Sequence, residues 1–297
     1  MIRVPPGLAD NPLHDPAWAD WIAGLPAAVD DLVGDWELTV DGEPMHGVCA
    51  IVVPVRTSDG REGVLKVGFP HLEAELEHLA LRHWAGNGAV ELLRADPHRS
   101  ALLLERLTQT NLDGRWDLEA CEIVGEIYGQ LHIPAPPQFR RLPDVIAPGL
   151  DRLKARGTDA VPRRIVEQAL ALGTAFVTDP ASAGTLIHTD LHYTNVLAGE
   201  GGLWLAIDPK PLSGDPHYEL APMLWNRWDE LAGQIRAGVR RRFDTLVDVA
   251  GLDEDRARAW VIVRMVLSAA EVAAHPSTPV ARDWLTTCVA VAKAVGS

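Results

Sequence analysis

Hydrophobic residues recur at helical spacing along much of the chain, mainly in its second half. Near the start, Trp18, Ile22, Leu25, Val29 and Leu32 fall on one face of a predicted helix. Residues 1–15 before it are rich in Pro and polar side chains, and we expect an extended arm there. The same spacing predicts further helices at residues 72–84, 118–133, 143–154, 163–177, 217–231, 240–249, 255–274 and 282–295.

Short apolar runs bounded by turn residues predict β-strands, and the first 107 residues hold most of them. These runs cover residues 36–40, 48–55, 64–67, 89–94 and 101–104. They would form a five-stranded antiparallel sheet in a small mixed lobe. We therefore expect an α+β fold with an N-terminal lobe at residues 1–107 and a larger, mostly helical C-terminal lobe at residues 108–297.

One further strand-turn-strand pattern interrupts the helical half, in the run LIHTDLHYTNVLAGEGGLWLAID at residues 186–208. A hairpin here would bring the carboxylate of Asp190, the amide of Asn195 and the carboxylate of Asp208 to one edge. Phosphoryl transfer from a nucleotide uses this set, because one carboxylate orients the attacking hydroxyl while an amide oxygen and a second carboxylate hold Mg²⁺. The spacing predicts Asp190 as catalytic base and Asn195 and Asp208 as metal ligands.

The same run permits a second interpretation, a metal-dependent hydrolase. His188, Asp190 and His192 crowd three candidate metal ligands into five residues. This hypothesis supplies no further ligand cluster and leaves Asn195, Asp208 and Lys66 without a role. A structural role is also common for an isolated histidine, and we expect His188 to brace the loop.

Composition narrows the partners. The formal net charge of −14 argues against nucleic acid or an anionic membrane and suits a small cationic substrate. The three cysteines lack metal spacing, no run of about 18 uncharged apolar residues occurs, and the first residues lack a signal-peptide core. We expect a cytoplasmic enzyme that is a monomer or a weak dimer.

The sequence resembles a known family at these positions. The motif HTDLHxxN from His188, followed by IDP from Ile207, is similar to the catalytic core of the aminoglycoside phosphotransferases, which are relatives of protein kinases. The runs WIAGLP, LLLERL and WLAIDPKPLSGDPHYEL are most similar to the streptomycin 6-phosphotransferase and hydroxyurea phosphotransferase branch.

The resemblance implies a two-lobed, protein-kinase-like fold and an ATP- and Mg²⁺-dependent phosphotransferase with an alcohol group as acceptor. The acceptor would be an aminoglycoside of the streptomycin type, and its phosphorylation would inactivate the antibiotic. Hydroxyurea and a non-antibiotic amino or sugar alcohol are the alternative acceptors. A nucleotide-binding relative without catalysis is disfavoured, because the lysine, the base and both metal ligands are present.

The resemblance also implies a nucleotide site in the first lobe. Lys66 is the one charge in its apolar strand and would bind the nucleotide phosphates. Glu77 on the helix that follows is the glutamate expected to hold it, with Glu73 as the alternative. Glu105 and Leu107 mark the hinge that binds adenine, chiefly through backbone groups. The protein-kinase pattern GxGxxG is missing between the first two strands.

We call residues 186–208 the catalytic run. The roles of three positions in or near it are less determined. Thr189 stands where the family usually has Gly, and Glu219 where it usually has a bracing Asp. Lys210 follows the metal aspartate by two residues, so it could reach a phosphate or a substrate group, or be an ordinary solvated lysine.

The acceptor site is expected on the helical lobe. An apolar and acidic cluster near the end of the predicted helix 217–231 would supply flat walls and negative charge to a cationic sugar. Its members are Trp225, Trp228, Asp229 and Glu230.

Overall fold

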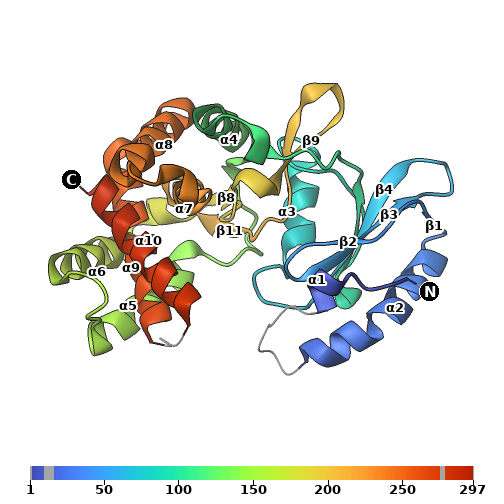
Figure 1. The fold of residues 1–297 in the computed structure, drawn as a ribbon, viewed down its shortest axis with the longest axis horizontal. Helices are drawn as coiled ribbons and strands as arrows, with labels where there is room; N and C mark the ends of the chain where they lie inside the picture. Colours follow the sequence, from blue (N-terminus) through green and yellow to red (C-terminus); the bar gives the residue numbers. More distant parts are fainter. Residues whose placement is uncertain (1, 10–16, 275–277, 297) are drawn as a thin grey trace. The chain divides into compact units, whose positions relative to one another are not determined.

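The fold is described from a computed structural model, which describes residues 2–9, 17–274 and 278–296. The chain divides into two compact units (Figure 1). The first comprises Met1–Gln109 and Ala198–Leu203, and the second comprises Thr110–Leu197 and Trp204–Ser297. Within the described ranges, no helix is long and apolar enough to cross a membrane.

The first unit is built on an antiparallel sheet with the order β1-β3-β4-β6-β5, and β2 pairs with β3. The expectation of five strands was wrong, because the two-residue strand β2 adds a sixth to the described sheet. Only the end of the run at residues 36–40 is a strand, since Glu37 adopts a left-handed conformation (φ 53°). The strands are β1 Thr39–Val40, β2 Met45–His46, β3 Ala50–Arg56, β4 Glu62–Gly68, β5 Leu92–Asp96 and β6 Ala101–Glu105.

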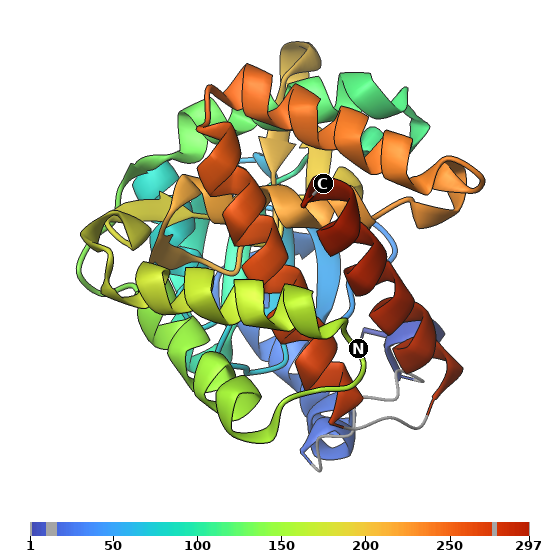
Figure 2. The same cartoon turned by 90° about the vertical axis from the view of Figure 1, so that its left-hand side faces the viewer.

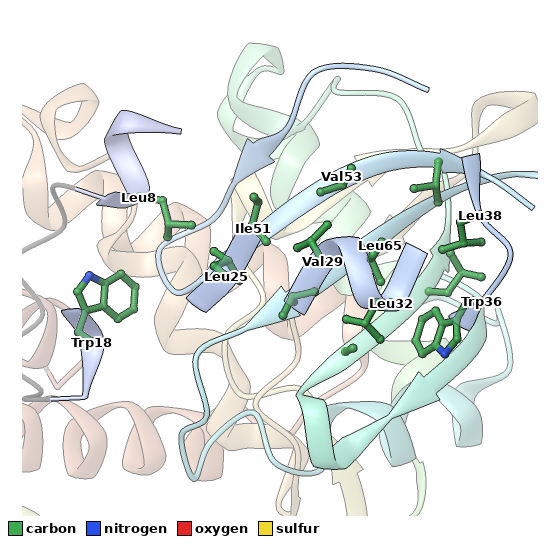
Figure 3. Packing of buried hydrophobic residues seen from close by; sticks show 14 residues of the cluster. Leu8, Trp18, Leu25, Val29, Leu32, Trp36, Leu38, Ile51, Val53 and Leu65 are labelled. Carbon is green, nitrogen blue, oxygen red and sulfur yellow. The ribbon is translucent and has the colours of Figure 1, made fainter. Parts of the chain in front are cut away.

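Helix α2 (Trp18–Asp35) covers one face of this sheet, as its apolar stripe predicts. Leu25, Val29 and Leu32 of the helix pack with Ile51 and Leu65 of the strands in one buried cluster (Figure 3). Side chains alternate between the two faces of a strand, so Lys66, next to Leu65, points away from this core. The alternation therefore sends the one lysine of β4 to the opposite face of the sheet.

Two helices of the first unit differ from expectation. Residues Pro6–Ala9 form the short helix α1 within the segment expected to be an extended arm, of which residues 10–16 lie outside the described part. Helix α3 begins at Glu77 and ends at Trp84, whereas turns occupy the first residues of the predicted helix 72–84. Glu77 thus lies in the first helical turn and Glu73 precedes the helix.

The second unit is mainly helical. Helix α9 packs against both α10 and α6, and α4 packs against α8. Figure 2 shows α9 and α10 in orange-red and dark red, lying side by side. The α-helices of this unit are α4 Asp117–Leu131, α5 Leu142–Arg156, α6 Arg163–Thr178, α7 Ala221–Trp225, α8 Ile235–Ala250, α9 Glu254–Ala273 and α10 Pro279–Val295.

Short β-strands form the catalytic run and the residues around it, between helices α6 and α7 in the sequence. Strand β8 lies between β7 and β11 in an antiparallel sheet, and β9 pairs with β10 in the predicted hairpin. The strands are β7 Ile133–Pro134, β8 Thr185–Ile187, β9 Val196–Ala198, β10 Trp204–Ala206 and β11 Leu212–Gly214. Single 3₁₀ turns lie at Pro97–Arg99, Leu112–Gly114, Pro180–Ser182, Tyr193–Asn195, Glu200–Gly202, Pro216–Leu220 and Trp228–Leu231.

The single helix predicted at residues 217–231 is wrong. A 3₁₀ segment, the five-residue helix α7 and a second 3₁₀ turn occupy this stretch instead. Arg227 is left-handed (φ 50°) and ends the helical path between α7 and the second turn. The apolar spacing was real, but Leu220, Leu224 and Leu231 are buried from three separate pieces.

Candidate active site

His188 follows strand β8 directly and is completely buried. Its Nε2 lies 2.9 Å from the carbonyl oxygen of Ile207, and its Nδ1 accepts the backbone N–H of Asp190 at 3.3 Å. Burial lowers the pKa of His188, which favours the neutral ring, with Nε2 as donor and Nδ1 as acceptor. The imidazole thus ties the start of the catalytic run to the segment that carries Asp208.

Thr189 is held in a left-handed conformation (φ 64°) that is unusual for a β-branched residue. Each of its polar groups has a partner: the N–H donates to Oε1 of Glu219 at 2.6 Å, and Oγ1 donates to the carbonyl oxygen of Lys210 at 2.7 Å. The carbonyl oxygen accepts a hydrogen bond from Nη2 of Arg264 at 2.7 Å. These three contacts maintain a conformation for which glycine would be the ordinary choice.

Glu219 therefore braces the catalytic run despite being longer than the aspartate usual in the family. Its side chain is fully buried, and Oε2 lies 2.7 Å from Nε2 of His132. Its backbone oxygen accepts the hydroxyl of Tyr128 at 2.9 Å. Helix α4 ends at Leu131, so the side chain of Glu219 spans from the end of this helix to Thr189.

Asp190, Asn195 and Asp208 are drawn together by backbone contacts within the second unit. Nδ2 of Asn195 donates to the carbonyl oxygen of Asp190 at 2.9 Å, and the N–H of Ile207 donates to the carbonyl oxygen of Asn195 at 2.9 Å. Asp208 comes next, exposed and left-handed (φ 57°). Non-glycine residues in this conformation often mark functional sites.

Oxygen donors at these positions fit a hard divalent cation. Since Nδ2 of Asn195 is used by Asp190, the amide leaves Oδ1 as its oxygen ligand, and Asp208 supplies a carboxylate. Mg²⁺ commonly takes one or two such protein oxygens together with nucleotide phosphates and waters. The residues present therefore fit Mg²⁺.

The hydrolase interpretation is not supported by the geometry. In the described residues, no group of three or more His, Cys, Asp or Glu side chains could hold a metal ion. Both ring nitrogens of His188 are used within the loop, and Nδ1 of His192 lies 3.2 Å from Oγ1 of Thr194. The crowded HxDxH pattern consequently does not become a cluster of ligands.

In the first unit, Lys66 forms an ion pair with Glu77. Its Nζ lies 2.7 Å and 2.8 Å from the two carboxylate oxygens, and side-chain exposure is 13% and 5% for the two residues. Glu77 is the first residue of helix α3, so the start of this helix carries the partner of Lys66. Burial from water gives this contact a fixed geometry that surface pairs lack.

The hinge residues divide into a structural side chain and an accessible backbone. Oε1 of Glu105 accepts the N–H of Glu91 at 2.7 Å, so this side chain supports the sheet. The N–H of Leu107 makes no backbone hydrogen bond within the part of the chain that the structure describes. This leaves the Leu107 N–H for a ligand and is compatible with the backbone role predicted for the hinge.

The four residues expected to bind the acceptor do not share one helix face. Trp225 packs edge-on against Trp284 at 5.2 Å between ring centroids, whereas Trp228 follows the break at Arg227. Arg227 binds both carboxylate oxygens of Glu230. Exposed Asp229 is the other acid of the cluster, and no described side chain is found bound to its carboxylate. Binding by these four residues stays a prediction.

Sequence reasoning missed a support on the far side of the catalytic run. The hydroxyl of Tyr193 donates to Oδ1 of Asp117 at 2.6 Å, and Nε of fully buried Arg242 donates to Oδ2 at 2.9 Å. Arg242 also binds the carbonyl oxygens of Met223 and Asn226. An arginine on the apolar side of an amphipathic helix is the only sequence signal for this contact.

The comparisons with known proteins identify the chain as a kinase-like phosphotransferase. The sequence profile of the family described as aminoglycoside/hydroxyurea antibiotic resistance kinase matches residues 35–275. The chain belongs to this family.

Curated relatives agree. The chain is 40% identical to the streptomycin 6-kinase of Streptomyces glaucescens, covering 84% of this chain and 83% of that protein. It is 40% identical to the hydroxyurea phosphotransferase of Kitasatospora aureofaciens, covering 90% and 79%. The streptomycin 6-kinase of Streptomyces griseus is 38% identical, with 89% of each chain covered. The expected membership and phosphotransferase class are confirmed.

Solved structures share the fold at lower identity. A thermostable mutant of aminoglycoside phosphotransferase APH(4)-Ia, in a ternary complex with ADP and hygromycin B, superposes with a TM-score of 0.61 at 18% identity, covering 89% of this chain and 97% of that one. A choline/ethanolamine kinase family protein from Mesorhizobium loti gives 0.63 at 16% identity, covering 90% and 94%. The predicted kinase-like α+β fold is confirmed.

Proposed function

We propose that this chain transfers the γ-phosphate of ATP to a hydroxyl of a streptomycin-type aminoglycoside, as a 6-phosphotransferase that inactivates the antibiotic. The observation that carries the proposal is the sequence identity of 40% and 38% to two streptomycin 6-kinases over most of their length. The geometry around Asp190 supports it. The formal net charge of −14 favours a cationic acceptor.

In this reaction the acceptor oxygen attacks the γ-phosphorus, and the bond from that phosphorus to the β,γ-bridging oxygen breaks. The electron pair of the broken bond leaves with ADP. The hydroxyl proton passes to the carboxylate of Asp190, which mainly orients the hydroxyl because the transition state is loose. Asn195 and Asp208 would hold Mg²⁺, which offsets charge on the phosphates when bound.

The first unit would bind the nucleotide. Lys66, kept in place by Glu77, carries the positive charge for the α- and β-phosphates. The backbone at Glu105 and Leu107 offers hydrogen bonds to adenine. In this proposal the first unit binds the nucleotide, and the second unit supplies Asp190 and the metal ligands.

On the acceptor side, Trp225 and Trp228 offer flat apolar surface to sugar rings, and Asp229 offers charge to a guanidinium group. Because Glu230 forms an ion pair with Arg227, it offers less negative charge to a cationic acceptor. Asp229 is accordingly the acid of this cluster that we expect to matter most. We propose that the protein acts in the cytoplasm as a monomer or a weak dimer.

Hydroxyurea is the second candidate acceptor, favoured by the 40% identity over 277 residues to a hydroxyurea phosphotransferase. The experiment measures ADP release from Mg-ATP against streptomycin, other aminoglycosides, hydroxyurea, and small amino or sugar alcohols. Asp190→Ala is the inactive variant, and Asp151→Ala, which removes an exposed carboxylate from helix α5, is its matched control. Streptomycin-dependent release that only Asp190→Ala abolishes supports the proposal. Release with hydroxyurea alone would replace the acceptor.

A further inference from the structure

Lys210 contacts three consecutive residues of the catalytic run. Its N–H donates to the carbonyl oxygen of His188 at 3.0 Å, and its carbonyl oxygen accepts Oγ1 of Thr189 at 2.7 Å. Its Nζ lies 2.8 Å from Oδ2 of Asp190. An ordinary solvated lysine on a turn would not make backbone and side-chain contacts with three residues around one carboxylate.

The contact with Asp190 distinguishes the two oxygens of this carboxylate. Oδ2 receives the ammonium of Lys210, while Oδ1 has no bonded partner among the residues that the structure describes. Side-chain exposure of 20% for Asp190 shows that the carboxylate still reaches solvent. Oδ1 is consequently the oxygen open to an incoming hydroxyl, and the ion pair fixes the direction in which it points.

Charge around the site gives the ammonium a second consequence. Lys210 is the only lysine or arginine between residues 185 and 215, a stretch that contains Asp190, Asp208 and Asp215. A nucleotide triphosphate would bring further negative charge to this place. The side chain of Lys210 is 35% exposed, so its ammonium counters that charge without leaving water completely.

We propose that Lys210 is the positioning residue for the base of phosphoryl transfer, holding Oδ2 of Asp190 so that Oδ1 receives the acceptor proton. This inference rests on the proposed function, in which Asp190 is the base. The bond changes are those of the reaction above; Lys210 gains and loses no proton in them. The backbone contacts of Lys210 with His188 and Thr189 keep its ammonium at this carboxylate.

The test combines Lys210→Met, which keeps the length but removes the charge, with Lys210→Arg, which keeps the charge. Lys210→Met should lower kcat about 10²-fold with the KM of the acceptor changed less than about 3-fold, because orientation and not binding is lost. Lys210→Arg should recover about a tenth or more of the parent kcat. Lys154→Met, an exposed position of helix α5, is the matched control and should keep full activity.

A double-mutant cycle with Asp190→Asn separates positioning from a merely structural role. If Lys210 acts through the carboxylate, the double variant should be no slower than Asp190→Asn alone. Independent, multiplied losses in kcat would overturn the proposal, as would Lys210→Met at parental kcat. If Lys210→Met does not fold, as judged by its thermal midpoint, Lys210→Gln takes its place.

The outcome is distinguishable from a failure of the proposed function. The cycle compares variants on whichever acceptor of the panel the parent phosphorylates, so rejection of streptomycin leaves the comparison intact. Parental activity in Asp190→Asn would remove the base assignment itself, and the inference about Lys210 would fall with it.

Discussion

Replacement of Glu219 by alanine should destabilise the second unit and slow catalysis together. The change leaves the buried N–H of Thr189 without an acceptor, which costs about 1–3 kcal/mol. It also removes the partner of His132 and the volume of a fully buried side chain. Together, the unsatisfied N–H and the cavity left by the side chain cost about 3–5 kcal/mol.

The thermal midpoint gives the direct assay. For a unit of roughly 180 residues each kcal/mol lowers the midpoint by about 2–4 °C, so we expect a loss of about 6–20 °C. Because Thr189 precedes Asp190, kcat should also fall about 10- to 100-fold in the fraction that stays folded. Glu219→Gln keeps an acceptor for Thr189 and should lose no more than about 2 kcal/mol.

Glu126→Ala removes an exposed glutamate from helix α4 and is the matched control, with an expected change within about 0.5 kcal/mol. A midpoint for Glu219→Ala within about 2 °C of that control would refute the bracing argument, given the slope per kcal/mol. Unchanged kcat in a destabilised Glu219→Ala would separate stability from catalysis and refute the link through Thr189.

Three further predictions follow from other contacts. Lys66→Met should lower kcat/KM for ATP about 10²-fold and reduce the thermal shift given by Mg-ATP, both measurable on the purified chain. Arg242→Met should cost about 3–5 kcal/mol in urea unfolding, because a fully buried cation leaves its acceptors unpaired. Burial raises the pKa of Asp215, but hydrogen bonds from His217 and Trp260 lower it by more. The pKa of Asp215 therefore lies below its ordinary value. Its contribution to stability is therefore present above about pH 4 and lost as the pH falls through the lowered value, so Asp215→Asn should be less stable at pH 7 and show a flatter stability profile in acid.

The strongest sequence patterns predicted the kinase-like α+β fold. The spacing from His188 to Asn195 and on to Asp208 predicted a loop followed by a hairpin, which the structure contains as β9 and β10. The ends of the long helix α9 were predicted to within a residue, since it buries apolar side chains from Ala257 to Ala269. The choice of Glu77 over Glu73 depended on where α3 begins, which periodicity does not determine.

Other features depend on contacts between distant residues. Asp117 and Arg242 are separated by 125 positions, and no local pattern links them. The break at Arg227 arises because three carbonyl groups near it bind Arg242, which competes with a continuous helix. The sequence left the role of Lys210 undetermined between binding a phosphate, binding the substrate and facing solvent. Its partner, Asp190, lies 20 positions earlier, and only the fold brings the two side chains together.

Phosphoryl transfer to an aminoglycoside hydroxyl with Asp190 as the base can be tested by following an isotope-labelled γ-phosphate. The parent chain, Asp190→Asn and Asp151→Asn would be incubated with labelled Mg-ATP and streptomycin, and the product located by mass spectrometry. We expect label in a streptomycin phosphate ester for the parent and for Asp151→Asn, and at least about 10²-fold less for Asp190→Asn. Equal labelling by Asp190→Asn, or label released only as inorganic phosphate by the parent, would contradict this mechanism.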